Sequence, residues 1–273
     1  LGFLRGVVDR TAELISSWML VGFIHGVMNT DNSSISGETI DYGPCAFMDD
    51  FYTNKVFSSI DTLGRSAYDQ QPCIGLWNLS RFAETLLCII DDNKEKATAK
   101  ARGILETYWP TFEKHFHSGL CQKIGLEHNE ENLALVFRLL DFMSEKRTDF
   151  TNTFRNLPKL ITAPDIFDAE TEEKFRCHKA FSDWSIEWKT KITEQNGSLD
   201  TTFRNMNKVN PLFIPRNHQV QRVIDFAIDE EDYQPLEEML TAITDPFKEN
   251  PKLMHLAKQP KPEEEIKQTF CGT

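Results

Sequence analysis

The sequence has 273 residues, of which 40% are hydrophobic and 26% are charged. Such a length and composition are typical of a globular protein with one large domain or two small ones. Acidic residues outnumber basic residues by 42 to 30, which gives a formal net charge of -12 at pH 7. Because this charge repels a phosphate backbone, and because no basic stretch is interleaved with aromatic residues, we expect no nucleic-acid partner.

The cysteines and the apolar runs argue against further classes of protein. The six cysteines are scattered and form no CxxC pair, so neither a zinc site nor a disulfide-stapled secreted fold is expected. We expect free thiols, with Cys271 near the chain end as the one open to redox chemistry. The longest apolar run, Trp18–Ile24, is too short to span a membrane, so no membrane partner is expected.

Taken in chain order, the first elements are a helix, a loop and a hairpin. Apolar residues recur at helical spacing from Val7 to Phe23. A loop follows over His25–Asn32. The β-branched segment Ile35–Ile40, with Gly37 as its turn, predicts a small β-hairpin that delivers Asp41.

The chain after Pro72 is predicted to be almost entirely helical. Pro158–Asp165 is interpreted as a loop between helices, and the proline- and charge-rich stretch Gln259–Glu265 as a surface tail. The aromatic stripes are expected to belong to the core. We therefore expect one mainly α unit over residues 1–273, with the loop and hairpin in 1–72 and a helical remainder in 73–273. The predicted amphipathic helices are Ile74–Ile90, Glu95–Phe116, Glu130–Lys146, Glu170–Glu194, Asn217–Ile228 and Leu236–Thr244.

The residues that point to chemistry are Asp31, Asn32 and Asp41. They supply three hard oxygen ligands from the loop and the predicted hairpin, and Mg²⁺ prefers a few such oxygens together with water and phosphate. Asp and Asn are also common turn formers, so ordinary Asx-turns remain an alternative at this point. His25 is interpreted as a residue that orients the loop by hydrogen bonding. No GxSxG, HExxH or Walker-type motif is present.

The same segment carries a resemblance to a known family. The string HGVMNTDN (His25–Asn32), followed by TIDYGP (Thr39–Pro44), resembles the catalytic core of selenoprotein O. These are kinase-fold enzymes that transfer AMP from ATP to protein hydroxyls. The resemblance spans essentially the whole chain. Further matches are Gly64-Arg65 with Gln71-Pro72 and Trp77-Asn78-Leu79, the string DFTNTFR from Asp149, Asn210-Pro211 with Arg216-Asn217-His218, and the tail FCGT.

The resemblance implies distinct roles for the three residues. Asp31 would be the proton acceptor, and Asn32 and Asp41 would bind Mg²⁺ (or Mn²⁺), with Asp41 contacting ATP through the metal. The fold implied is a kinase-like C-terminal lobe with a helical extension. The partners implied are ATP and proteins that present Ser, Thr or Tyr hydroxyls. The location implied is mitochondrial for a eukaryotic protein, which we favour, and cytoplasmic for a bacterial one.

The resemblance does not extend to one part of the family, its N-terminal lobe. The family's N-terminal lobe, with its glycine-rich region, phosphate-binding lysine and arginines, has no counterpart here, and the chain starts with Leu1. We therefore expect part of a longer protein that, alone, binds ATP poorly and transfers nothing. A truncated pseudokinase acting as an interaction module is the alternative. A protein kinase is less favoured, because ordinary kinases place their Asn five residues after the catalytic Asp, whereas Asp31 and Asn32 are adjacent.

Six further residues are expected to support structure rather than chemistry. Arg65, Trp77 and Asn78 are interpreted as holding the lobe together, and Arg216, Asn217 and His218 as positioning the start of a helix. The family's tail cysteine has a redox character, so Cys271 is expected to be either a regulatory disulfide partner or an exposed thiol.

Overall fold

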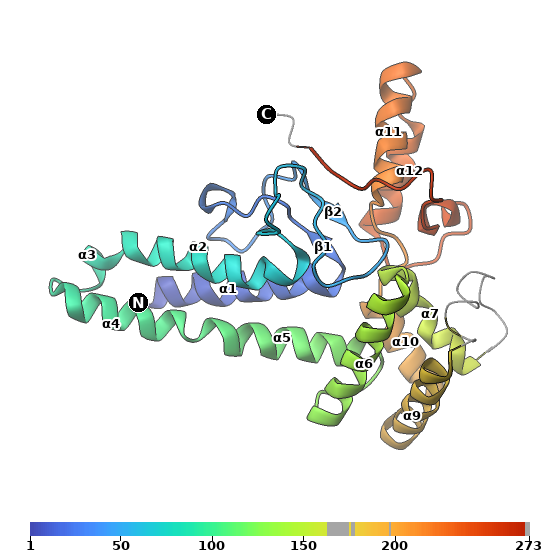
Figure 1. Cartoon of the computed structure of the whole chain (residues 1–273), viewed down its shortest axis with the longest axis horizontal. Helices are drawn as coiled ribbons and strands as arrows, with labels where there is room; N and C mark the ends of the chain where they lie inside the picture. The colour runs from blue at the N-terminus through green and yellow to red at the C-terminus, as the bar shows by residue number, and fades with distance from the viewer. Residues whose placement is uncertain (163–174, 176–177, 197, 271–273) are drawn as a thin grey trace. The chain divides into compact units, whose positions relative to one another are not determined.

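A computed structural model describes residues 1–162, 175, 178–196 and 198–270 (Figure 1). Contacts divide the chain into two compact units. Unit 1 comprises residues 1–46, 53–118 and 267–273, and unit 2 comprises residues 47–52 and 119–266. The expectation of a single unit over residues 1–273 stays a prediction. The mainly α fold with one small sheet is confirmed.

Unit 1 is built around α1 (Gly2–Leu20). This helix packs against α2 (Gln71–Thr85) and α4 (Lys94–Leu105), beside which it lies in Figure 1. The expected helix is present but begins earlier and ends at Leu20, because Gly22 turns the chain with φ +73°. The face that α1 buries follows the helical spacing of its apolar residues, namely Leu4, Val7, Val8, Ala12, Ile15 and Met19.

The small sheet lies next to the expected loop, but its strands are not where the sequence predicted them. Strand β1 (Phe23–Ile24) pairs with β2 (Ala46–Phe47), and the short 3-10 helix η1 (Thr30–Asn32) lies between them in sequence. The predicted hairpin at Ile35–Ile40 is wrong, because this segment contains no strand.

Side chains from elsewhere replace the missing ladder in that segment. Arg10 on α1 donates to the carbonyl of Ile35 at 2.9 and 3.1 Å. Trp18 donates its indole N–H to Thr39 Oγ1 at 2.8 Å. The β-branched residues of this segment therefore do not form a strand, since no second strand satisfies the backbone and the segment is held as a loop.

Two long helices predicted after Pro72 are each divided. The first ends at Thr85 and is followed by α3 (Leu87–Ile90). The second becomes α4 and α5 (Tyr108–Lys123). Pro110 explains this second break, because it has no N–H to donate to the carbonyl of Glu106, where an uninterrupted helix would need one. The short helix η2 (Tyr68–Gln70) precedes α2.

Unit 2 contains the end of α5, and its first complete helix is α6 (Glu130–Lys146), whose bounds match the prediction. Asn129 caps its start by accepting from the N–H of Asn132 at 2.8 Å. Helix α7 (Phe150–Thr162) corrects the loop that was predicted from Pro158 onward, as far as Thr162. Pro158 is tolerated inside this helix because Phe154 and Leu157 are fully buried and anchor the turn that it weakens.

Of the remaining helices of unit 2, the last two match the predicted ranges closely, and the earlier ones match them less well. The predicted helix Glu170–Glu194 falls partly outside the described residues. Its described part is not helical at His178 and becomes α9. Helix α10 was not predicted, and the two last helices were. Their bounds are α9 (Lys179–Asn196), α10 (Leu199–Val209), α11 (Asn217–Asp229), α12 (Gln234–Thr244) and the short 3-10 helix η3 (Met254–Ala257).

Burial confirms the assignment of the aromatic stripes to the core. Phe181, Trp184 and Trp188 of α9 are buried, and α9 packs against α6 and α10. Much of the stretch Gln259–Glu265 is exposed, as expected. Among the described cysteines, Cys45, Cys73, Cys88 and Cys121 are free thiols, whereas Cys271 lies outside the described residues. Of the described helices, none is long and apolar enough to cross a membrane.

Candidate active site

The three predicted site residues lie in the loop region of unit 1. Asp31 and Asn32 form η1, which closes because the backbone N–H of Asn32 donates to the carbonyl of Asn29 at 3.1 Å. Asp41 lies in the extended stretch before β2. Asp31 and Asp41 are exposed, and Asn32 is half-buried. The two carboxylates are therefore accessible to a ligand from solvent.

The side chain of Asn32 has a defined orientation. Its Nδ2 donates to the carbonyl of Val27 at 3.0 Å. Because the amide nitrogen is used in this way, the carbonyl oxygen Oδ1 is the atom of Asn32 that remains to face a cation. An Asx-turn alone does not require this bond, so the orientation supports the ligand interpretation.

Asp41 adopts a backbone conformation that is uncommon outside glycine. Its φ is +57°, and the N–H of Gly43 donates to Asp41 Oδ1 at 3.4 Å. Asp is one of the few residues that tolerate the left-handed region, because its short side chain bonds the local backbone. The strain is of the kind found at functional sites, where the surroundings hold the residue in place.

His25 connects the segment of Asn32 with the segment of Asp41. Its Nε2 bonds the carbonyl of Ile40 at 2.8 Å, and the N–H of Val27 donates to its Nδ1 at 3.4 Å. With Nδ1 as acceptor, Nε2 carries the proton and donates to Ile40. Burial lowers the pKa of His25, so the ring is neutral at pH 7 and this tautomer persists.

The link through His25 is short on both sides. Ile40 immediately precedes Asp41, and Val27 is the residue whose carbonyl holds Asn32. The ring is fully buried and packs on Trp18 at a centroid distance of 5.4 Å. The prediction that His25 orients the loop by hydrogen bonding is confirmed.

Two buried side-chain amides of helix α2 hold the backbone of the loop by hydrogen bonds. Gln71 accepts from the N–H of His25 at 3.0 Å and donates to the carbonyl of Phe23 at 3.0 Å. Asn78 donates to the carbonyl of Met28 at 3.2 Å and to Ser33 Oγ at 2.9 Å. These two residues are seven apart, so they lie on one face of the helix.

The roles of these amides were only partly foreseen. The prediction that Asn78 supports structure is confirmed. No structural role was predicted for Gln71, although its place beside Pro72 in a matched motif indicated one. Arg65 lies over the ring of Trp77 at 4.8 Å, a contact between side chains that fits the predicted structural role of this pair.

A close backbone approach fixes the other end of the loop. Gly26 has φ +81°, and a Cβ added there would lie 2.8 Å from the carbonyl oxygen of Pro44. Thr269 donates its hydroxyl to the same carbonyl at 2.5 Å. Gly26 is therefore required both by its dihedral angle and by the space available.

Replacing Gly26 by alanine is expected to lower the free energy of unfolding by about 1–3 kcal/mol, since a non-glycine residue is strained at this φ and meets backbone. Gly103→Ala is the matched control. Gly103 lies in α4, and an added Cβ there would meet no atom within 4 Å beyond the neighbouring backbone of its own helix, so alanine is expected to stabilise by about 0.5–1 kcal/mol. Urea unfolding measures both. Equal stability of the two variants would contradict the close approach.

The donor set fits a hard divalent cation. One amide oxygen and one or two carboxylates leave positions for water and phosphate oxygens, as Mg²⁺ prefers. Within the described part of the chain, no three His, Cys, Asp or Glu side chains cluster in a way that would hold a metal by themselves. The residues therefore suit a cation that arrives together with phosphate, and not a closed structural metal site.

A second charged cluster, in unit 2, is structural. The Arg216 side chain is fully buried. It donates to Asp149 at 2.7 and 3.1 Å and also to Asp49. Arg216 immediately precedes α11, which agrees with its predicted role at a helix start, and its guanidinium is buried against the two carboxylates. Burial raises the pKa of Asp49 to about 6; Arg216 opposes this rise and Asp149 adds to it.

Comparisons with known proteins agree with the motifs. A family model described as "Protein adenylyltransferase SelO" matches residues 1–244. A protein of Bradyrhizobium diazoefficiens is 47% identical over 271 residues, covering 99% of this chain and 55% of the relative. One of Geobacillus kaustophilus is 45% identical and one of Halalkalibacterium halodurans 44%, covering 99% and 100% of this chain and 54% of each relative.

These three relatives are each named "Protein nucleotidyltransferase YdiU". The chain spans about half the length of these curated relatives. All three come from bacteria, so they give no support to the mitochondrial location that the resemblance favoured. The cytoplasmic alternative stays a prediction.

Proposed function

Because the chain belongs to the SelO family of protein adenylyltransferases, we propose that it carries the catalytic and metal-binding residues of an enzyme that transfers AMP from ATP to Ser, Thr or Tyr hydroxyls of proteins. Nucleotidyl transfer is what the names of the family and of its relatives state. The observation that carries the finer proposal is the bridge through His25, which ties the backbone beside Asp41 to the residue that holds Asn32.

In this proposal Asp31 accepts the proton of the acceptor hydroxyl. The hydroxyl oxygen forms a bond to the α-phosphorus of ATP, the bond from that phosphorus to the β-phosphate oxygen breaks, and pyrophosphate leaves. The exposure of Asp31 on η1 supports this role, because a protein substrate must reach it from solvent.

Asn32 Oδ1 and the Asp41 carboxylate would hold Mg²⁺, or Mn²⁺, together with the phosphates of ATP. When bound, the cation would offset the charge that develops on the phosphate oxygens. The loop contributes the orientation of these two ligands before ATP arrives, through the bonds to Val27 and from His25. Pre-organised ligands avoid a reorganisation cost at the moment of reaction.

The proposal includes two more statements. The first is that the fold is a kinase-like C-terminal lobe, and the second is that activity depends on a further part of the protein. The mainly helical fold that carries its catalytic loop between short strands supports the first. The second rests on the net charge of -12 and on the greater length of the relatives. Residues 1–273 alone are expected to bind ATP weakly and to transfer nothing, because strong cationic contacts to the triphosphate are needed.

The test compares residues 1–273 with the longer Bradyrhizobium relative, each incubated with ATP, Mg²⁺ and a mixture of candidate acceptor proteins. Intact-mass measurement and α-labelled ATP identify the group transferred. We expect the relative to add AMP and residues 1–273 to add none. Addition of phosphate would favour a protein kinase. No transfer by the relative would favour an interaction module, and AMP transfer by residues 1–273 would contradict the dependence on a further part.

A further inference from the structure

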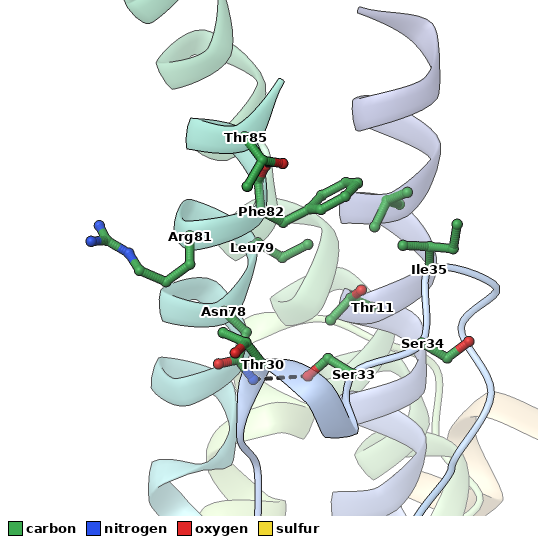
Figure 2. A pocket seen from close by; sticks show the side chains of 11 residues that line it. Thr11, Thr30, Ser33, Ser34, Ile35, Asn78, Leu79, Arg81, Phe82 and Thr85 are labelled. Carbon is green, nitrogen blue, oxygen red and sulfur yellow. Dashed lines mark hydrogen bonds between the residues drawn. The ribbon is translucent and has the colours of Figure 1, made fainter. Parts of the chain in front are cut away.

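A pocket of about 270 Å³ lies in unit 1 beside η1, on the side where α1 and α2 face one another (Figure 2). Val7 and Thr11 line it from α1, and Leu79 and Phe82 line it from α2. The loop after η1 contributes Ser33 and its neighbours up to Ile35. None of the three site residues lines it.

The loop wall of this pocket is held in place without a ligand. Asn78 donates to Ser33 Oγ at 2.9 Å, the bond drawn in Figure 2, and Ser33 donates to the carbonyl of Asn29 at 3.1 Å. Arg10 holds the carbonyl of Ile35 from α1. A preformed pocket loses little free energy in ordering its walls when it binds.

The chemistry of the lining is neutral. Apolar side chains of both helices form the floor, and hydroxyls such as those of Thr11 and Ser33 line the remaining walls. Arg81 is the only charged residue among those that line the pocket, and Figure 2 shows its guanidinium pointing away. It pairs with Glu84 at 2.8 Å and lies over the ring of Trp77 at 5.5 Å.

This lack of available charge discriminates between occupants. A triphosphate would find no cation inside, and a charged side chain would lose its hydration without a partner. An uncharged apolar group would instead bury its surface against Leu79 and Phe82. The hydroxyls of the walls can bond the backbone of a polypeptide that carries such a group.

The position of the pocket relates it to the proposed reaction. Thr30 and Ser33 both line it, and Asp31 and Asn32 lie between them in the chain. A side chain in the pocket and a hydroxyl at Asp31 would therefore belong to residues that lie close together along an acceptor polypeptide.

We propose that this pocket seats an apolar, uncharged side chain of the acceptor protein and thereby selects the hydroxyl presented to Asp31. The proposal rests on the proposed function for the meaning of the site, but the binding itself does not need nucleotide. It makes the Thr11 and Phe82 positions determinants of substrate choice, distinct from the residues assigned to the metal and to proton transfer.

The experiment measures binding by residues 1–273 of short fluorescent alanine-based peptides with one serine. Phenylalanine, leucine, aspartate or lysine stands two, three or four residues from that serine. We expect the best phenylalanine or leucine peptide to bind at least about tenfold more tightly than its aspartate and lysine counterparts. Equal binding of apolar and charged peptides would overturn the proposal.

Two variants locate the binding. Thr11→Phe fills the pocket from α1, and Thr85→Trp covers it from the exposed end of α2; each is expected to remove the apolar preference. Thr190→Phe, an exposed position on α9, adds a ring elsewhere and should leave the preference intact. Retained preference in both pocket variants, or a preference lost equally in Thr190→Phe, would count against the pocket.

A third variant separates this proposal from the proposed function. Asp31→Asn is expected to keep the apolar preference, because Asp31 does not line the pocket. Should the peptides bind as expected while the longer relative transfers no AMP, the pocket stands and the proposed function falls. Loss of ATP binding, and not of peptide binding, in Thr11→Phe would identify a nucleotide pocket and overturn the proposal.

Discussion

Replacing Arg216 by methionine is expected to lower the free energy of unfolding of unit 2 by about 3–5 kcal/mol at pH 7, because it leaves two buried carboxylates without their shared cation. Asp149 is buried and Asp49 half-buried, and the Arg216 side chain that joins them is 0% exposed.

The same variant has an expected pH dependence. One cation cannot neutralise two carboxylates, and in the intact protein the pKa of Asp49 is already raised to about 6 from 3.8 by burial. Between these values the folded protein holds a proton that the unfolded chain has released, so stability rises as pH falls from about 6 toward 4. Without Arg216 this uptake of protons is larger, and the deficit of the variant is expected to be smaller at pH 5 than at pH 8.

Hydrogen exchange on the whole chain measures this effect separately in the two units. Amides of α6 and α7 are expected to lose protection, while those of α1 and α2 change less. Arg204→Met is the matched control, because Arg204 and its partner Asp200 are both largely exposed and such a pair contributes little. Protection of α6 and α7 in Arg216→Met within about 1 kcal/mol of the unmodified chain would show that the buried triad is dispensable.

Asp41→Asn is expected to lower AMP transfer by about 10²–10³-fold in the longer relative when made at the matching residue, since it removes one charge from the proposed metal site. This substitution is expected to preserve the local backbone conformation. Asn tolerates the left-handed backbone as Asp does, and its amide oxygen can still accept from the N–H of Gly43.

Cation binding gives a readout in the present chain that does not depend on activity. Mn²⁺ titrated into residues 1–273 and followed by electron paramagnetic resonance is expected to bind more weakly to Asp41→Asn than to the unmodified chain. Asp92→Asn, in an exposed loop before α4, is the control and should change neither quantity. Unchanged Mn²⁺ affinity and unchanged transfer in the Asp41 variants would remove Asp41 from the metal site.

Local signals explain which helices were predictable. Helix α6 was predicted with its true bounds from its apolar stripe; in the structure Asn129 caps its start, and Arg147, at φ +51°, ends it in the left-handed region. Helix α7 was missed because Pro158 is a local breaker, and its tolerance depends on burial of Phe154 and Leu157, which sequence does not display.

The structure of the loop region could not be predicted from local signals. The β-branched residues at 35–40 and Gly37 predicted a hairpin, but the bonds that hold the segment include those from Arg10 and Trp18, which are more than twenty residues away. The candidate residues Asp31, Asn32 and Asp41 were found through their motif. The orientation of Asn32 and the part played by Gln71 depend on contacts between segments, and spacing along the chain does not encode them.

The bond between Thr269 and Pro44 has a consequence for how the protein is made. It joins residues 225 apart, and Thr269 also pairs with the backbone near Ser58. Synthesis on the ribosome proceeds from the N-terminus, and earlier parts of a chain fold while later parts are still being added. The contact between Thr269 and the loop that runs from Gly26 to Pro44 therefore forms only after residue 269 has left the ribosome, long after the loop itself has been synthesised.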